Sequence, residues 1–181
     1  MKHQRAGWAI ALGLLVLPML AHADDKPKQP QPPAITKDYD EVRDITTIST
    51  KDYDIPDIGF FDAFYTYDGK KPTRPDSVAF LFDRVGDSLE MADPEDVKLV
   101  YFRYGDVKST FPVTGHSAIV IGVHIQEYLT IQIPTETFSA MCKASKVLLE
   151  IKEEPSSIKG ESLAAMRELL KEMPPPDPPK G

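Results

Sequence analysis

Short runs of β-branched and aromatic residues, separated by Gly, Pro and Asp, make up most of the chain between residues 35 and 173. Such runs are typical of β-strands. A parallel pair of strands needs a crossover of about a dozen residues, usually a helix, and no segment of that kind separates successive runs. The spacing therefore predicts neighbouring antiparallel strands. We expect them near residues 43–49, 59–67, 77–83, 97–104, 107–111, 117–123, 128–133 and 146–152.

Two segments have the apolar spacing of helices. The segment TETFSAMCKA has apolar residues at i, i+3 and i+4, and Thr135 is its expected N-cap. The segment ESLAAMRELLKEM, residues 161–173, is apolar along one face and ends before Pro174. Together the patterns predict a mainly β fold, an antiparallel β-sandwich with a short helix and a C-terminal amphipathic helix that closes an edge or an open end.

The first 23 residues have the pattern of a cleavable secretory signal peptide. Lys2 and Arg5 precede the apolar run WAIALGLLVLPML, and AHA stands before Asp24. No later run approaches the roughly 18 apolar residues that a transmembrane helix needs. We therefore expect a periplasmic or secreted protein whose mature chain has no transmembrane segment.

Proline-rich segments flank the body of the chain. Residues 24–34 and 174–181 are expected to be tails, because proline lacks the backbone donor that a strand or helix interior needs. A single domain, residues 35–173, remains. Its stability has to come from a packed core, since the lone cysteine, Cys142, has no partner for an intrachain disulfide.

The formal net charge of −7 opposes nonspecific binding to nucleic acid and to anionic lipid. The loop KKPTRP is the local exception, and its cations Lys70, Lys71 and Arg74 predict contact with an anionic envelope component or a protein partner. Tyr67 is expected to line a groove for a sugar or apolar ligand, as are the other tyrosines near strand ends, Tyr65, Tyr101 and Tyr104. The alternative is a solubilising loop whose prolines limit edge pairing.

The tetrapeptide KDYD occurs twice, at residues 37–40 and 51–54. An EF-hand calcium loop needs Gly at its sixth position and Glu at its twelfth. Counted from Asp52, those positions hold Asp57 and Ala63, so the motif fails. An irregular calcium site made by both copies is the alternative to acids on exposed turns that flank the strand DITTIS.

No catalytic residue, metal ligand or cofactor is assigned from the sequence. GHSAI lacks the second Gly of a nucleophile elbow, which argues against His116 and Ser117 as a catalytic pair. Cys142 lies on the apolar stripe of its helix and is expected to be a buried small hydrophobe. Acids are abundant, but nothing selects a catalytic pair among them.

The strings YDEVRDITTIST and TYDGKKPTRPDSVAFLF resemble a group of small exported bacterial proteins of unassigned function. That group shares a Y-D, D-x-T-T opening, a G-K-x-P hairpin and a C-terminal helix. The resemblance implies a β-rich fold and no reaction, cofactor or site. We expect a non-catalytic binding or interaction domain of the bacterial cell envelope, and the alternative is a carboxylate-dependent hydrolase acting on envelope glycans.

Overall fold

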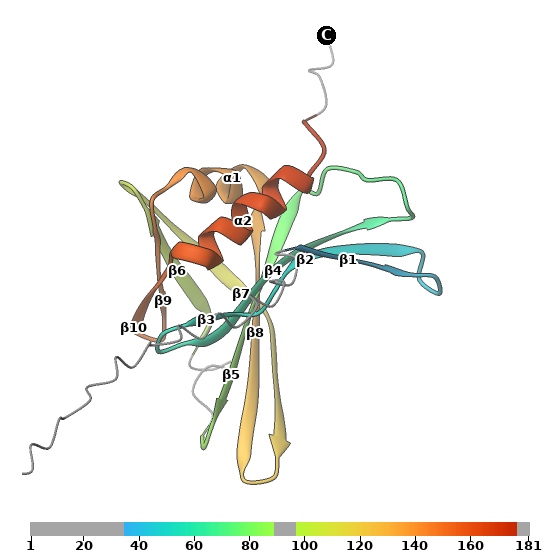
Figure 1. Ribbon diagram of the computed structural model, residues 1–181. Helices are drawn as coiled ribbons and strands as arrows, with labels where there is room; N and C mark the ends of the chain where they lie inside the picture. The colour runs from blue at the N-terminus through green and yellow to red at the C-terminus, as the bar shows by residue number, and fades with distance from the viewer. Residues whose placement is uncertain (1–34, 89–96, 177–181) are drawn as a thin grey trace, which may run out of the picture. The chain divides into compact units, whose positions relative to one another are not determined.

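The structure, a computed structural model, describes residues 35–88 and 97–176. These residues form antiparallel strands and two helices (Figure 1). The strands are β1 (Ile35–Asp40), β2 (Ile45–Thr50), β3 (Tyr53–Ile55), β4 (Gly59–Asp68), β5 (Ser77–Gly86), β6 (Leu99–Tyr104), β7 (Val107–Ile121), β8 (His124–Pro134), β9 (Val147–Ile151) and β10 (Glu154–Ile158). The helices are α1 (Thr135–Lys143) and α2 (Gly160–Glu172). The mainly β, antiparallel class with a short helix and a C-terminal helix is confirmed.

The expected signal peptide and the N-terminal tail lie outside the described residues, as do residues 177–181 of the expected C-terminal tail. Neither helix in the described ranges combines the length and the apolar character that crossing a membrane requires.

The strands follow one hydrogen-bonded path in the order β1-β2-β4-β5-β8-β7-β6-β9-β10, and β3 pairs with β4. The long strand β7 joins the two parts of this path. Its residues 107–112 pair with β6, whereas residues 113–121 pair with β8. A β-bulge between Val113 and Gly115 marks the change of partner, and bulges bend a strand. Because hydrogen bonds join all the strands into one path, the two separate sheets of a sandwich stay a prediction.

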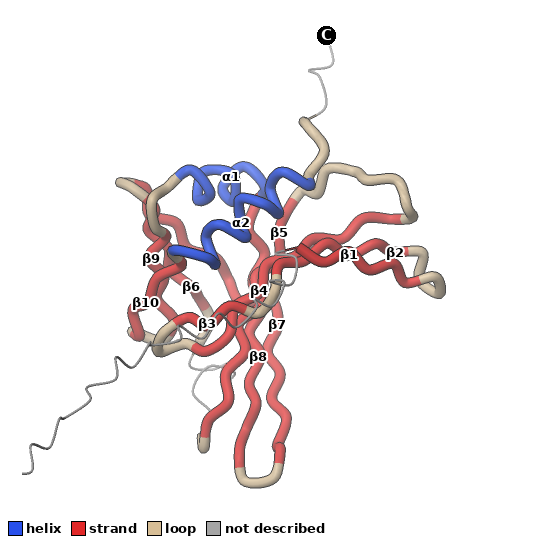
Figure 2. Tube along the Cα trace, in the orientation of Figure 1, coloured by secondary structure: helices blue, strands red, loops and turns tan. Residues whose placement is uncertain are grey.

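The hydrophobic core lies between the sheet and the two helices, which lie next to each other on the same side of the strands (Figure 2). Helix α2 packs against β1, β2, β3 and β4, and α1 packs against β5 and β8. The rings of Phe80 and Phe138 meet edge to face with their centroids 5.9 Å apart, which fixes α1 on the sheet. Both phenylalanines are fully buried.

The start of α1 differs from the sequence prediction. Pro134 occupies the N-cap position and no side chain caps the helix, so the expected Thr135 N-cap is wrong. Thr135 is buried in the first turn, where its Oγ1 atom donates a 2.6 Å hydrogen bond to the carbonyl oxygen of Pro75. The hydroxyl therefore ties the helix to the segment before β5.

Strands β1, β3 and β10 were not predicted from the sequence. Each has a composition that disfavours strands: β1 is ITKDYD, β3 is only three residues long, and β10 is EPSSI. Pairing with a neighbour overrides these local preferences. The expected separate strands 107–111 and 117–123 are parts of the single strand β7.

Three strands extend past the rest of the sheet as what we call the arm, defined as residues 83–86, 115–121 and 124–128 (Figure 1). In the arm, β8 is the middle strand and pairs with β5 on one side and with β7 on the other. Gly122 closes the β7–β8 hairpin with a φ of +65°, a backbone conformation that favours glycine.

Candidate ligand-binding site

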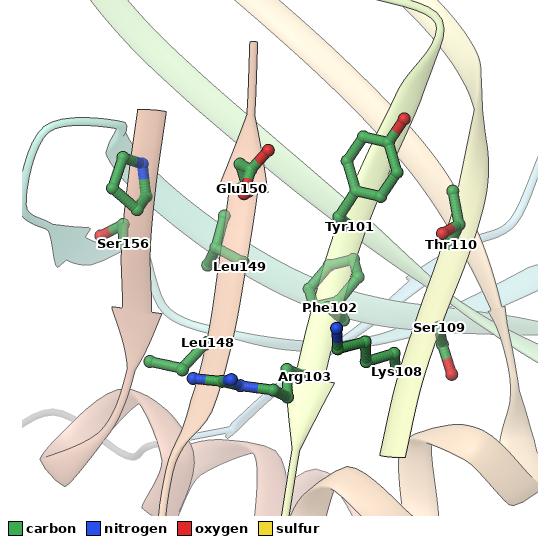
Figure 3. A pocket seen from close by; sticks show the side chains of 11 residues that line it. Tyr101, Phe102, Arg103, Lys108, Ser109, Thr110, Leu148, Leu149, Glu150 and Ser156 are labelled. Carbon is green, nitrogen blue, oxygen red and sulfur yellow. The ribbon is translucent and has the colours of Figure 1, made fainter. Parts of the chain in front are cut away.

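A hollow of about 450 Å³ lies on the outer face of β6, β7, β9 and β10 (Figure 3). Successive side chains of a strand point to opposite faces. In β6, Val100, Phe102 and Tyr104 are buried in the core, so Tyr101 and Arg103 face outward into the hollow. The alternation of the strand therefore places an aromatic ring and a cation side by side on the exposed face.

Two cations face each other across this hollow. In the antiparallel register of β6 and β7, Arg103 lies directly opposite Lys108. Facing residues of this kind have Cβ atoms about 5 Å apart, and like charges in such positions are destabilising. Within residues 35–88 and 97–176, neither side chain makes an ion pair. The pair therefore creates a local positive potential in an acidic protein.

Apolar and polar groups complete the lining of the hollow. Tyr101 is 47% exposed and lies opposite Glu150 of β9, while Leu148 of β9 lies opposite Arg103. In Figure 3 the guanidinium of Arg103 lies beside Leu148, and Glu150 lies farther along β9. The hollow therefore has the two cations level with Leu148 at one end and Tyr101 level with Glu150 at the other. This arrangement suits an anionic ligand that also has an apolar part.

The four ligand-binding residues predicted from the sequence do not form one site. Lys70 and Lys71 are exposed, and the Lys70 ammonium lies 4.4 Å from the centroid of the Tyr39 ring. Arg74 donates a 2.8 Å hydrogen bond from Nη1 to the carbonyl oxygen of Pro174, after α2. Tyr67 is buried in the core, so its ring does not line a groove beside the loop.

A second hollow of about 380 Å³ lies next to the end of this loop. Its lining includes Pro75 and Asp76 but neither Lys70 nor Lys71. Neither of the two hollows therefore includes the exposed loop cations Lys70 and Lys71.

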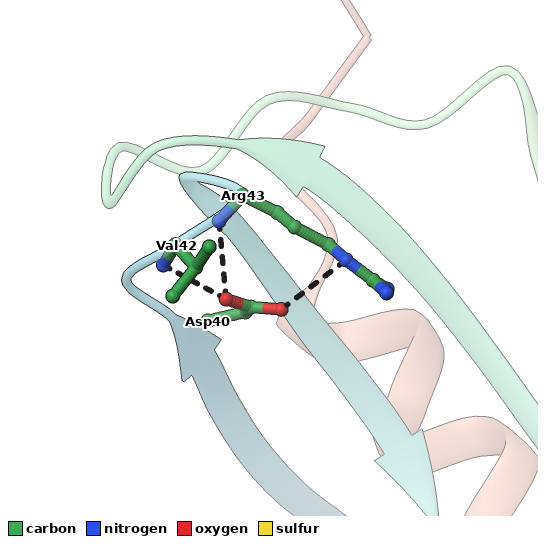
Figure 4. Close-up of polar contacts among 3 residues, drawn as sticks. All are labelled: Asp40, Val42 and Arg43. Atoms are coloured by element: carbon green, nitrogen blue, oxygen red, sulfur yellow. Dashed lines mark hydrogen bonds and ion pairs between the residues drawn. The ribbon is translucent and has the colours of Figure 1, made fainter.

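The first KDYD copy is the end of a strand. Asp40 closes the β1–β2 turn, where its Oδ1 atom accepts hydrogen bonds from the backbone N–H groups of Val42, at 2.9 Å, and Arg43, at 3.1 Å (Figure 4). Its Oδ2 atom lies 3.6 Å from Nε of Arg43. The carboxylate therefore satisfies turn amides, as Asp commonly does.

The second copy contributes Tyr53 and Asp54 to β3, and Asp57 follows it in the next turn with a φ of +69°. Across the described ranges, no three His, Cys, Asp or Glu side chains come close enough to hold a metal ion. The two KDYD copies thus lie in different strands, the first at the end of β1 and the second at the start of β3.

The nucleophile candidates are separated by the fold. His116 and Ser117 are consecutive in β7 and so point to opposite faces. Cys142 is buried, as predicted, and burial raises the pKa of its thiol to about 12 although Arg167 acts to lower it. A thiol with so high a pKa is not a nucleophile near neutral pH.

One carboxylate has a strongly perturbed pKa. Burial raises the pKa of Asp62 to about 6, and Asp52 raises it further, whereas hydrogen bonds from Thr50 and from the Ala63 N–H lower it. A raised pKa of this kind is what a general acid requires. Asp62 lines neither of the two hollows.

The opposition of Arg103 and Lys108 can be predicted from the turn residues between them. In YFRYGDVKST, the dipeptide Gly105–Asp106 forms the two-residue turn expected of it, and Gly105 has a φ of +59°. A two-residue turn fixes the register of a hairpin, so the residues on either side pair outward from the turn. Arg103 and Lys108 therefore lie opposite each other, and the sequence of the hairpin predicts this pair of like charges.

No family model matches this chain, and comparisons with curated proteins and with solved structures also found no match. The resemblance to small exported bacterial proteins stays a prediction. The proposals below depend on the geometry and charge of the described residues.

Proposed function

We propose that this protein is an exported, non-catalytic binding domain of the bacterial cell envelope that takes an anionic, partly apolar ligand in the hollow of β6, β7, β9 and β10. The observation that carries the proposal is the facing pair Arg103 and Lys108, neither of which has an ionic partner among the described residues. The expected signal peptide supports the location.

The charge arrangement favours an anion over other ligands. Arg103 and Lys108 are register neighbours on β6 and β7 and carry charges of the same sign, and the Arg103 guanidinium lies beside Leu148 (Figure 3). An anionic group bound near both cations gains two attractions, and the arginine fork suits a carboxylate or phosphate.

The apolar part of the ligand follows from the lining of the hollow. Tyr101 presents a half-exposed ring at one end, and Leu148 adds aliphatic surface opposite Arg103 at the other. A volume of about 450 Å³ is in the range of small-molecule sites, roughly 300–1,000 Å³. A small anionic amphiphile fits both the size and the chemistry of this surface.

The proposal is tested with the anionic aromatic probe 8-anilinonaphthalene-1-sulfonate at low salt. The variant Arg103→Glu/Lys108→Glu reverses two charges in the hollow and is expected to weaken probe binding by about tenfold or more, or about 1.4 kcal/mol. The matched control, Lys70→Glu/Lys71→Glu, reverses two charges in the exposed loop and is expected to bind as the unchanged protein does.

Chemical-shift changes of backbone amides during titration locate the probe, and we expect them at Tyr101, Lys108 and Leu148. Loss of binding in the loop variant with normal binding in the hollow variant would contradict the proposal and favour the Lys70–Arg74 loop.

The alternative function, a carboxylate-dependent hydrolase acting on envelope glycans, needs a general acid, and Asp62 is a carboxylate whose pKa burial raises to about 6, although it lines neither hollow. If that alternative holds, Asp62 is the general acid. The test is release of soluble fragments from peptidoglycan by the purified protein, compared with Asp62→Asn. Hydrolysis that disappears in this variant would replace the binding proposal.

A further inference from the structure

The hollow of β6, β7, β9 and β10 contains charges of both signs in two separate rows. Tyr101 and Arg103 are two residues apart on β6 and point to the same face. The first row sets Arg103 between Lys108 of β7 and Leu148 of β9, and the second row sets Glu150 of β9 beside Tyr101. The rows lie roughly 7 Å apart, because a strand rises about 3.3–3.4 Å per residue. The hollow therefore presents two cations in one row and a carboxylate in the next.

Glu150 is an acid without an ionic partner in the described part of the chain. It is exposed on β9, and its neighbours across the strands are Tyr101 on one side and Pro155 of β10 on the other. The carboxylate therefore stands between a phenol ring and a pyrrolidine ring, and neither ring offers it a positive charge.

Glu150 also stays apart from the cations of the hollow itself. It is a diagonal neighbour of Arg103, and long side chains in such positions are within reach of each other. Among the ion pairs of the described residues, none joins these two. The guanidinium lies beside Leu148, and Glu150 lies farther along β9 (Figure 3). Both kinds of charge are therefore left for a ligand.

The carboxylate of Glu150 discriminates among ligands that have an anionic group. A ligand with negative charge in both rows is repelled by Glu150. A ligand with an ammonium in the second row is attracted to Glu150, and its ammonium lies beside the ring of Tyr101, whose π face attracts cations. We infer that the ligand is a zwitterion, whose anionic group binds at Arg103 and Lys108 and whose ammonium binds at Glu150.

The distance between the rows selects the length of the zwitterion. In an α-amino acid the ammonium nitrogen and the carboxylate carbon are bonded to the same Cα atom and lie only about 2.5 Å apart. Two residues of extended peptide span about 7 Å, which matches the rows. Tyr101 and Leu148 add apolar surface, one in each row. A dipeptide with free termini and apolar side chains is therefore the ligand, an inference that rests on the proposed function because both need an anionic group at Arg103 and Lys108.

The test is a titration of backbone amide chemical shifts with leucyl-leucine and with N-acetyl-leucyl-leucine, up to about 10 mM, or tenfold above a millimolar Kd. Acetylation removes the ammonium and keeps the carboxylate. We expect the acetylated dipeptide to bind about fivefold more weakly, as an exposed charge pair and a cation–π contact together imply. Glu150→Gln is expected to weaken binding of leucyl-leucine by the same factor and not to weaken binding of its acetylated form.

Two controls accompany this comparison. Glu136→Gln removes an exposed acid of α1 outside the hollow and is expected to keep the affinity for leucyl-leucine. Free leucine has both charges at too short a spacing, so its affinity is expected to be the same for Glu150→Gln and for the unchanged protein.

Equal affinities of the unchanged protein for leucyl-leucine and its acetylated form would overturn the inference. An equal effect of Glu150→Gln on these two ligands, or on leucyl-leucine and free leucine, would do the same. So would an absence of shifts with leucyl-leucine where the sulfonate probe shifts the amides of the hollow. In these outcomes the proposed function stands as long as Arg103→Glu/Lys108→Glu weakens binding of the sulfonate probe, and it fails when that variant binds the probe as the unchanged protein does.

Discussion

Thr50 donates a hydrogen bond from Oγ1 to Oδ1 of Asp62 at 2.6 Å, and the same hydroxyl oxygen accepts the backbone N–H of Ala63 at 2.9 Å. These contacts lie where β4 changes its partner from β2 to β3. The hydroxyl therefore replaces a ladder hydrogen bond at a break in the sheet. The Asp62 carboxylate, which accepts the hydrogen bond from Thr50, is partly desolvated, and burial raises its pKa to about 6.

Stability should fall as Asp62 ionises. Its folded-state pKa of about 6 lies above its ordinary value of 3.8, so the protonated form is favoured by folding. The stabilising contribution is complete below about pH 4 and is lost as the pH rises through 6. Asp62→Asn keeps an oxygen acceptor for Thr50 without the charge. Solvent screening reduces the effect of the charge, so we expect Asp62→Asn to raise the free energy of unfolding by about 1 kcal/mol at pH 8.

The measurement is urea unfolding of both proteins from pH 4 to pH 8. We expect the difference between them to shrink to about zero below pH 4. A difference that is constant with pH would show that the substitution acts through packing and not through the charge.

Gly59 should tolerate no side chain. Its φ is +108°, and a Cβ atom there would overlap the backbone carbonyl oxygen of Asp83 on the paired strand β5. We expect Gly59→Ala to lower the free energy of unfolding by more than about 2 kcal/mol. Gly122→Ala is the control, because Gly122 also has a positive φ of +65° but has open space around it. We expect a loss of about 1 kcal/mol there, and equal losses at the two sites in urea unfolding would refute the steric explanation.

The thiol of Cys142 should be inert in the folded protein. It is 4% exposed, and burial raises its pKa to about 12. We expect iodoacetamide at pH 8 to leave the native protein unlabelled by mass spectrometry and to modify it fully in denaturing urea. Rapid labelling of the native protein would mean that α1 opens readily from the sheet.

The cations of the KKPTRP loop should differ in their effect on stability. Arg74→Ala removes the 2.8 Å hydrogen bond to the carbonyl oxygen of Pro174, which joins the loop to the end of α2. We expect Arg74→Ala to lower the free energy of unfolding, measured in urea, by about 1–2 kcal/mol. Lys71→Ala removes an exposed side chain and should change stability by less than about 0.5 kcal/mol. A larger loss of stability for Lys71→Ala than for Arg74→Ala would contradict a stabilising role of the hydrogen bond between Arg74 and Pro174.

The strands with strong local patterns could be predicted from the sequence. The apolar run SVAFLFD forms the first seven residues of β5, and the segment ESLAAMRELLKEM, which has helical spacing, forms most of α2. Strand β1 could not be predicted, because ITKDYD is charged and forms a strand through its pairing with β2. The burial of Tyr67 was also missed, since the face that a strand presents to the core depends on which neighbours cover it.

The site predicted from the sequence and the hollow proposed from the structure involve different residues. Lys70, Lys71 and Arg74 were predicted to bind a ligand because they are close together in the chain. Arg103 and Lys108 are separated by a hairpin turn, and their opposition becomes visible only through the register of β6 and β7. The hollow also needs Leu148 and Glu150 of β9, which is far along the chain.

The sequence by itself determined the antiparallel β class, the two helices and the burial of Cys142, because residue alternation and helical spacing record locally which side chains avoid water. Tertiary structure alone decided that β7 changes partner at Val113–Gly115, that Asp62 is partly desolvated and that β5, β7 and β8 pair along the arm. Each of these depends on contacts between segments far apart in the chain, and local patterns do not encode which segments meet.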